Sequence, residues 1–222
     1  MVYLLPFLAI GVGYIIALLI SSKKVLIHQY LLSFSGAFLL SITLFELLPE
    51  VFESPSKSIG VLIMIGILLQ IILDFITKGA EHGHVHLHDN RRDFPWLLFL
   101  GLSIHSIIEG LPITENVDVL WGVVIHKIPI AVILTIYFIS AGYSKRTTVL
   151  FLLLFACMTP LGSFFKHNIS VLSDYSTEIN AIAIGIFLHV STTILFESSK
   201  DHKFNLMKLT TIFIGVILAY LL

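Results

Sequence analysis

Residues 102–134 read LSIHSIIEGLPITENVDVLWGVVIHKIPIAVIL. A short polar connector near 114–118 separates two apolar runs, 95–113 and 117–141, and each run is long enough to cross a bilayer as a helix. A connector this short makes the two helices adjacent and antiparallel. The stretch therefore predicts a transmembrane helical hairpin.

Three ionisable side chains inside this hairpin suggest a metal site. His105 and Glu109 are four residues apart and share one helix face. His126 follows the connector at the distance at which His105 precedes it, so both histidines lie at one depth, roughly 13–16 Å from the outer surface. Ionisable groups in a membrane are costly and are functional candidates, and two imidazoles with a carboxylate suit a divalent transition metal. We expect the three to bind one ion near the midplane, where transport sites lie.

Other polar residues in the spans, Ser106 among them, are candidates for a second site or for the ion pathway. Lys127 needs a carboxylate partner such as Glu109 or Glu46, loss of its proton, or access to water. Glu46 and Glu50 lie toward the outer end of the second apolar run, where they would attract cations. His189 is a ligand or a satisfied polar group. Pro112 and Pro129 each remove a helix hydrogen bond, which is tolerated where the freed carbonyl lines a cavity.

The hairpin belongs to a chain that is apolar almost throughout. Of 222 residues 57% are hydrophobic and 12% are charged, about half the charged share of a soluble domain. We count eight spanning runs, and the connectors leave no room for a second domain. The prediction is an all-α integral membrane protein, a single transporter domain over 1–222, whose eight transmembrane helices lie at 2–20, 30–52, 58–77, 95–113, 117–141, 147–165, 179–196 and 206–222.

Basic residues predict the orientation, because cytoplasmic loops carry the excess of Lys and Arg. Of thirteen basic residues, Lys127 lies inside a span, Lys57 and Lys166 fall on one side, and ten fall on the other. The ten are Lys23, Lys24, Lys78, Arg91, Arg92, Lys145, Arg146, Lys200, Lys203 and Lys208. The ten-residue side is expected to be cytoplasmic and both termini extracytoplasmic, in a multi-pass protein of the cell membrane.

The connector near 78–94 is then cytoplasmic and rich in histidine. Its sequence EHGHVHLHDNRRD places His82, His84, His86 and His88 in alternation. Such tracts bind metal loosely, so we expect a modulating contact with metal rather than the main site. One cysteine, Cys157, excludes an intrachain disulfide and a multi-cysteine zinc cluster, and no basic patch suggests nucleic acid.

At these residues the sequence resembles the ZIP (Zrt/Irt-like protein) family of metal transporters. The family pattern His-Asn/Ser-x-x-Glu/Asp-Gly is matched by HSIIEG at 105–110, and HKIP at 126–129 is similar to the next helix's motif. FELLPE at 45–50 and TPLG at 159–162 are also similar. The resemblance implies uptake of zinc or a related metal into the cytoplasm, a primary site on helices four and five, a homodimer, and an elevator-like movement of helices one, four, five and six against the other four.

The chain departs from the family where a second metal would bind. Ile130 and Lys127 replace acidic residues of helix five, and no Glu stands near Thr193 in helix seven. Their joint loss indicates a single ion, with the Lys127 ammonium in the second position.

Two other functions fit the same residues. Three ligands with an open position suit an intramembrane zinc hydrolase, in which Ser106 would be the candidate nucleophile. A metal-gated channel of the same fold is the other alternative. We predict a transporter and not an enzyme, with no cofactor and with Zn²⁺ as substrate; iron, manganese and cadmium stay open, although two imidazoles favour zinc over manganese.

Overall fold

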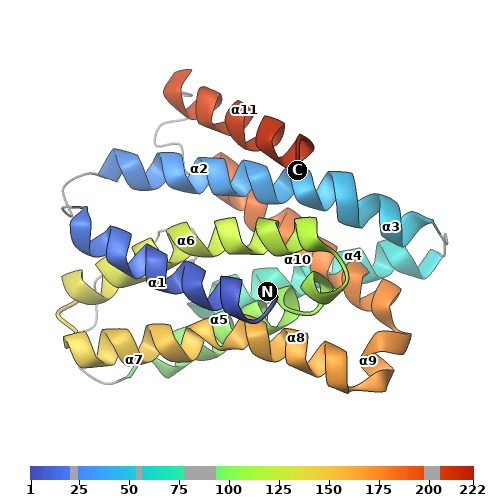
Figure 1. Ribbon diagram of the computed structural model, residues 1–222, viewed down its shortest axis with the longest axis horizontal. Coiled ribbons are helices and arrows are strands. Elements are labelled where there is room, and N and C mark those ends of the chain that lie inside the picture. Colours follow the sequence, from blue (N-terminus) through green and yellow to red (C-terminus); the bar gives the residue numbers. More distant parts are fainter. Residues whose placement is uncertain (21–24, 54–56, 78–93, 198–205) are drawn as a thin grey trace.

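The computed structural model describes residues 1–20, 25–53, 57–77, 94–197 and 206–222, and every regular element within these ranges is helical (Figure 1). The elements in chain order are α1 (Leu4–Leu19), α2 (Val25–Ile42), the π-helical turn η1 (Thr43–Leu47), α3 (Leu48–Phe52), α4 (Lys57–Thr77), α5 (Trp96–Glu109), the 3₁₀ turn η3 (Pro112–Thr114), α6 (Val117–Ser140), α7 (Lys145–Ala156), α8 (Met158–Asn168), α9 (Ser170–Asp174), α10 (Ser176–Glu197) and α11 (Leu206–Tyr220).

The described helices account for all eight predicted runs, but not all are equally long. Six apolar helical stretches are long enough to cross a membrane: Gln29–Phe52, Ser58–Thr77, Trp96–Thr114, Val117–Ser140, Lys145–Asn168 and Ser176–Phe196. The first and last predicted spans, α1 and α11, are shorter; at 1.5 Å per residue, α1 covers about 24 Å of a core roughly 30 Å thick. The chain is an integral membrane protein of the all-helical class.

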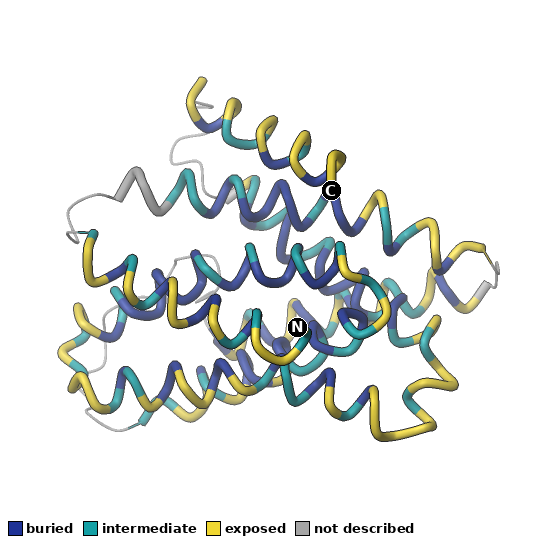
Figure 2. Tube along the Cα trace, in the orientation of Figure 1, coloured by how far each residue is buried: buried dark blue, intermediate teal, exposed yellow. Residues whose placement is uncertain are grey.

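The hairpin that carries the predicted site lies at the centre of the bundle. Helix α6 packs between α1 and α2, and most of its residues are buried, whereas α4 and α11 turn exposed apolar faces outward (Figure 2). An apolar exterior around polar interior groups is the arrangement expected when the surrounding solvent is lipid.

Prolines interrupt two of the predicted spans. The predicted span 95–113 ends as regular helix at Glu109, because Pro112 has no N–H to continue the ladder. Pro112 cannot donate to the carbonyl of Ile108, but the N–H of Leu111 donates to that carbonyl instead, at 3.1 Å. Pro160 likewise divides the span 147–165 into α7 and α8, and the π-helical turn η1 precedes Pro49.

The helices form two groups that glycines hold together internally. In the group α1, α5, α6, α7 and α8, Gly110 and Gly162 bring α5 and α8 into backbone contact, and Gly13 places α1 against the backbone of α6. In the group α2, α4, α10 and α11, Gly66 and Gly185 do the same for α4 and α10. Small residues permit such close crossings in membranes. We call these the hairpin group and the α2 group.

Contacts between the two groups are of another kind. Gly122 of α6 faces α2, but it meets only the side chains of Leu39 and Ile42, at 3.5–3.6 Å. Gly101 of α5 faces α4, where an added carbon would meet the Thr77 methyl group first and the Leu73 carbonyl oxygen at 3.7 Å. At these two glycines the boundary between the groups is packed chiefly by side chains, whereas the glycine crossings inside each group meet backbone atoms.

Candidate metal site

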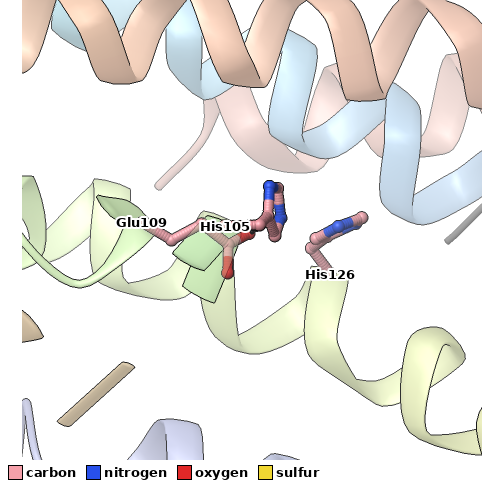
Figure 3. Close-up of side chains that lie close together, drawn as sticks. All are labelled: His105, Glu109 and His126. Carbon is pink, nitrogen blue, oxygen red and sulfur yellow. Dashed lines mark ion pairs between the residues drawn. The ribbon is translucent and has the colours of Figure 1, made fainter. Parts of the chain in front are cut away.

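The structure brings His105, Glu109 and His126 together. One ligand atom from each lies within 4.8 Å of the others, and the side chains project toward one another from α5 and α6 (Figure 3). Each is at most 3% exposed. A cavity of about 10 Å³ lies among these side chains and those of Leu102, Lys127, Ile130 and Phe155. It is about large enough for one small ion without its waters.

Local sequence explains this geometry. The i, i+4 spacing stacks His105 and Glu109 on one face of α5. The chain then turns through η3, and Asn116 begins α6 because its side chain accepts hydrogen bonds from the backbone N–H groups of Asp118 (2.9 Å) and Val119 (3.2 Å). Helix α6 runs back beside α5 and continues through Pro129, which returns His126 to the depth of His105.

The two oxygens of Glu109 have different surroundings. Oε1 lies 3.1 Å from Nε2 of His105 and has no hydrogen-bond partner among the described residues. Oε2 accepts from the Lys127 ammonium at 2.8 Å. Two ligands of a tetrahedral zinc ion, with bonds of roughly 2.0–2.1 Å, lie about 3.3 Å apart. The spacing of Oε1 and Nε2 is therefore close to that of two ligands sharing one ion.

Hydrogen bonds orient the rings of both histidines at the site. Gln70 donates from its amide to Asp74 Oδ1 at 2.9 Å, so its Oε1 faces His105 Nδ1, also at 2.9 Å. An amide oxygen only accepts, so Nδ1 of His105 carries a hydrogen, and Nε2 of the neutral ring then presents a lone pair. The Ser35 hydroxyl lies 3.2 Å from Nδ1 of His126, and this contact fixes how that ring is turned. Metal-binding histidines are commonly oriented in this way.

Lys127 is held beside the site by three contacts. Its ammonium donates to Glu109 and to Ser106 Oγ, the latter at 3.0 Å, and lies 5.0 Å from the centre of the Phe155 ring. Of the two carboxylates proposed as its partner, the structure selects Glu109 over Glu46. The role of Ser106 in this geometry is to accept from Lys127.

Comparison with known proteins identifies the family. The family model described as ZIP zinc transporter matches residues 79–222, which include all of α5 and α6. The chain belongs to the ZIP zinc transporter family. The resemblance stated from the sequence is thereby confirmed. The family is one of transporters and not of enzymes, which sets aside the hydrolase interpretation.

Individual ZIP relatives match shorter stretches. Zinc transporter ZIP1 of Danio rerio is 38% identical over 95 residues, which cover 39% of this chain and 31% of that protein. Protein zntD of Dictyostelium discoideum is 31% identical over 150 residues, or 58% and 22% of the two chains. Zinc transporter ZIP1 of Plasmodium falciparum is 28% identical over 146 residues, or 59% and 40%. The chain thus spans less than half the length of each of these relatives.

Several predicted pathway residues of this ZIP chain do not join the cluster. Glu50 is exposed and Glu46 half-buried near the end of the α2–α3 segment. His189 on α10 pairs with Asp74 Oδ2 at 2.8 Å. The tract with His82, His84, His86 and His88 lies outside the described residues.

Three residues that contact the side chains of the ZIP site, Ser35, Gln70 and Phe155, were not predicted from the sequence, nor was Asp74, which accepts from Gln70. The signal for two of them is present, because Gln70 and Asp74 are polar, four residues apart, in an otherwise apolar run. Ser35 and Phe155 are of types common in any membrane helix, so nothing in the sequence marks them.

Proposed function

We propose that this chain carries a divalent transition-metal ion, zinc first, into the cytoplasm, and that His105, Glu109 and His126 bind the ion during transport. The observation that carries the proposal is the buried cluster itself: Glu109 Oε1 lies 3.1 Å from His105 Nε2, and one ligand atom from each of the three side chains lies within 4.8 Å of the others. A carboxylate oxygen and an imidazole nitrogen at this distance share a cation, which is either a proton on the ring or a metal ion. Imidazole and carboxylate ligands at tetrahedral spacing suit zinc, and iron, manganese and cadmium are the other candidates.

The test is metal uptake into proteoliposomes. We expect His105→Ala, Glu109→Ala and His126→Ala each to reduce zinc uptake at least tenfold while the protein still inserts, because each removes one of three ligands. Matched controls are His167→Ala and Glu178→Ala, which delete exposed side chains of the same types on α8 and α10. Near-normal uptake by the His105 and Glu109 variants would refute the proposal.

Carrier action is favoured over a channel by the burial of the site. All three ligands are closed to solvent, so an ion bound there needs a change of conformation to leave. The boundary between the two helix groups is the moving one in this proposal, because at Gly122 it is packed by side chains, whereas the crossings of α5 with α8 and of α4 with α10 bring backbones into contact. We propose that the hairpin group moves against the α2 group, the elevator-type movement that the family resemblance implies.

Topology, assembly and the histidine tract complete the proposal. We propose that residues 1–222 act as one transmembrane unit of eight spans in the cell membrane, with both termini outside, supported by the ten-to-two distribution of basic residues. The proposal of a homodimer rests on the family resemblance alone and is tested by the mass of the protein in detergent.

Changing His82, His84, His86 and His88 to Ala should alter the apparent affinity for zinc without abolishing uptake. Complete loss of uptake would exclude a merely modulating role for this histidine tract.

A further inference from the structure

Both site histidines are hydrogen-bonded across the boundary between the two helix groups. His105 of α5 bonds to Gln70 of α4, and His126 of α6 bonds to Ser35 of α2. All four side chains are at most 3% exposed. The ligands thus belong to the hairpin group, while the groups that orient their rings belong to the α2 group.

The Gln70 side chain, whose amide oxygen accepts from His105, is itself held by a hydrogen bond. Asp74 accepts from the amide of Gln70 with one oxygen and pairs with His189 of α10 through the other. This chain of bonds ties Gln70 to two helices of the α2 group and fixes which atom its amide presents. His105 therefore meets an oxygen at a set position, and its tautomer depends on that contact.

A relative shift of the two groups would remove both orienting contacts. A hydrogen bond at 2.9 or 3.2 Å is lost within about 1 Å of displacement. The rings would then be free to rotate about their side-chain torsions, and the nitrogen that binds metal would no longer be set. The three ligands would travel together while their orientation was released.

We propose that Gln70 and Ser35 are positioning residues that couple metal affinity to conformation. They orient the rings of His105 and His126 for metal binding only while the hairpin group and the α2 group keep the relative position seen in this structure. Affinity is therefore highest in this closed arrangement and falls once the hairpin group shifts, which promotes release. By linkage, a bound ion favours the closed arrangement to the same extent. The inference rests on the proposed function and adds to it a way in which the movement of the helix groups lowers metal affinity and so releases the ion.

The experiment compares Gln70→Ala and Ser35→Ala with the wild type in zinc uptake into proteoliposomes. Loss of a group that orients a ligand typically weakens metal binding about 10- to 100-fold, so we expect KM to rise by at least tenfold in Gln70→Ala with the maximal rate retained. Direct zinc titration, with the four tract histidines changed to Ala, should show a parallel rise in Kd. The matched control is Ser41→Ala, which deletes a buried hydroxyl of α2 that donates to the Ala37 carbonyl of its own helix at 2.8 Å.

A double variant separates orientation from packing. Gln70→Glu combined with Asp74→Asn reverses the amide and the carboxylate, so an oxygen still faces His105 and an amide still links the two residues. We expect it to recover most of the KM lost in Gln70→Ala, because His105 again meets an acceptor.

The outcomes are distinct. An unchanged KM in both Gln70→Ala and Ser35→Ala would overturn the inference, and if the ligand variants still lose uptake, the proposed function stands without it. A lower maximal rate at unchanged KM, or an equal rise of KM in Ser41→Ala, would indicate a structural role and also overturn it. Normal uptake in the ligand variants themselves would instead refute the proposed function.

Discussion

At the scale of single residues, Lys127 is the feature that separates this site from a two-metal centre. Its ammonium lies 2.8 Å from Oε2 of Glu109, on the side of the carboxylate that a second ion would need. Like charges this close repel strongly in a medium of low dielectric constant. We therefore predict that the lysine leaves Oε1 for a single ion and occupies the position of a second ion itself.

Replacing Lys127 tests this account. We expect Lys127→Ala to keep one ion per subunit, since it adds no ligand. Lys127→Glu should create a second site or tighten zinc binding about tenfold or more, because a carboxylate replaces the repelling charge. Elemental analysis of protein whose four tract histidines are changed to Ala gives the number of ions. Two ions at the hairpin of the wild type would contradict the prediction.

The residue scale also shows what sequence reasoning reaches. His105, Glu109 and His126 could be brought together from spacing alone, because helical periodicity and a short connector determine their relative depth. Gln70 could not be assigned to His105, since that contact depends on how α4 is rotated against α5. Lys127 was predicted to pair with Glu109 or Glu46, and only the packing of α6 against α5 decides between them.

At the scale of elements, composition predicted where helices run but not how they end. Each of the eight apolar runs corresponds to one, two or three consecutive helical elements among the described residues. The proline effects depend on context: Pro160 divides a span into α7 and α8, whereas α6 continues through Pro129. Because tertiary packing decides whether a missing hydrogen bond is tolerated, the sequence could not distinguish these cases.

The crossing of α5 and α8 yields a prediction on stability. A methyl group at Gly162 would collide with the backbone of α5 at Ile107, so we expect Gly162→Ala to destabilise the fold by about 1–3 kcal/mol, as overpacking does. Gly60→Ala on α4 is the matched control, because nothing lies within 4 Å of its added carbon. Thermal unfolding in detergent should show a lower midpoint for the first variant only. Equal midpoints would mean that the crossing is looser than the structure indicates.

At the scale of the whole molecule, orientation in the membrane can be measured with introduced thiols. In a Cys157→Ser background, we expect Ser170→Cys to react with an impermeant maleimide in intact cells, because the loop between α8 and α10 is extracytoplasmic in the proposed topology. Ser140→Cys, at the end of α6, should react only after permeabilisation. Both serines are exposed, so accessibility on the protein is matched, and the reverse labelling pattern would invert the topology.

The pairing of Lys127 with Glu109 also has an electrical consequence. Their charges cancel, and two neutral imidazoles add none, so a bound divalent ion gives the moving site a net charge of about +2. Crossing a potential of 100 mV is worth about 2.3 kcal/mol for each charge. We therefore expect an inside-negative diffusion potential, set with valinomycin and potassium, to accelerate zinc uptake into proteoliposomes. An uptake rate that does not change with the potential would rule out a net charge on the loaded site. If no other ion is coupled, two charges correspond to about three powers of ten in accumulation per 100 mV, so the membrane voltage alone would let the cell gather a scarce metal.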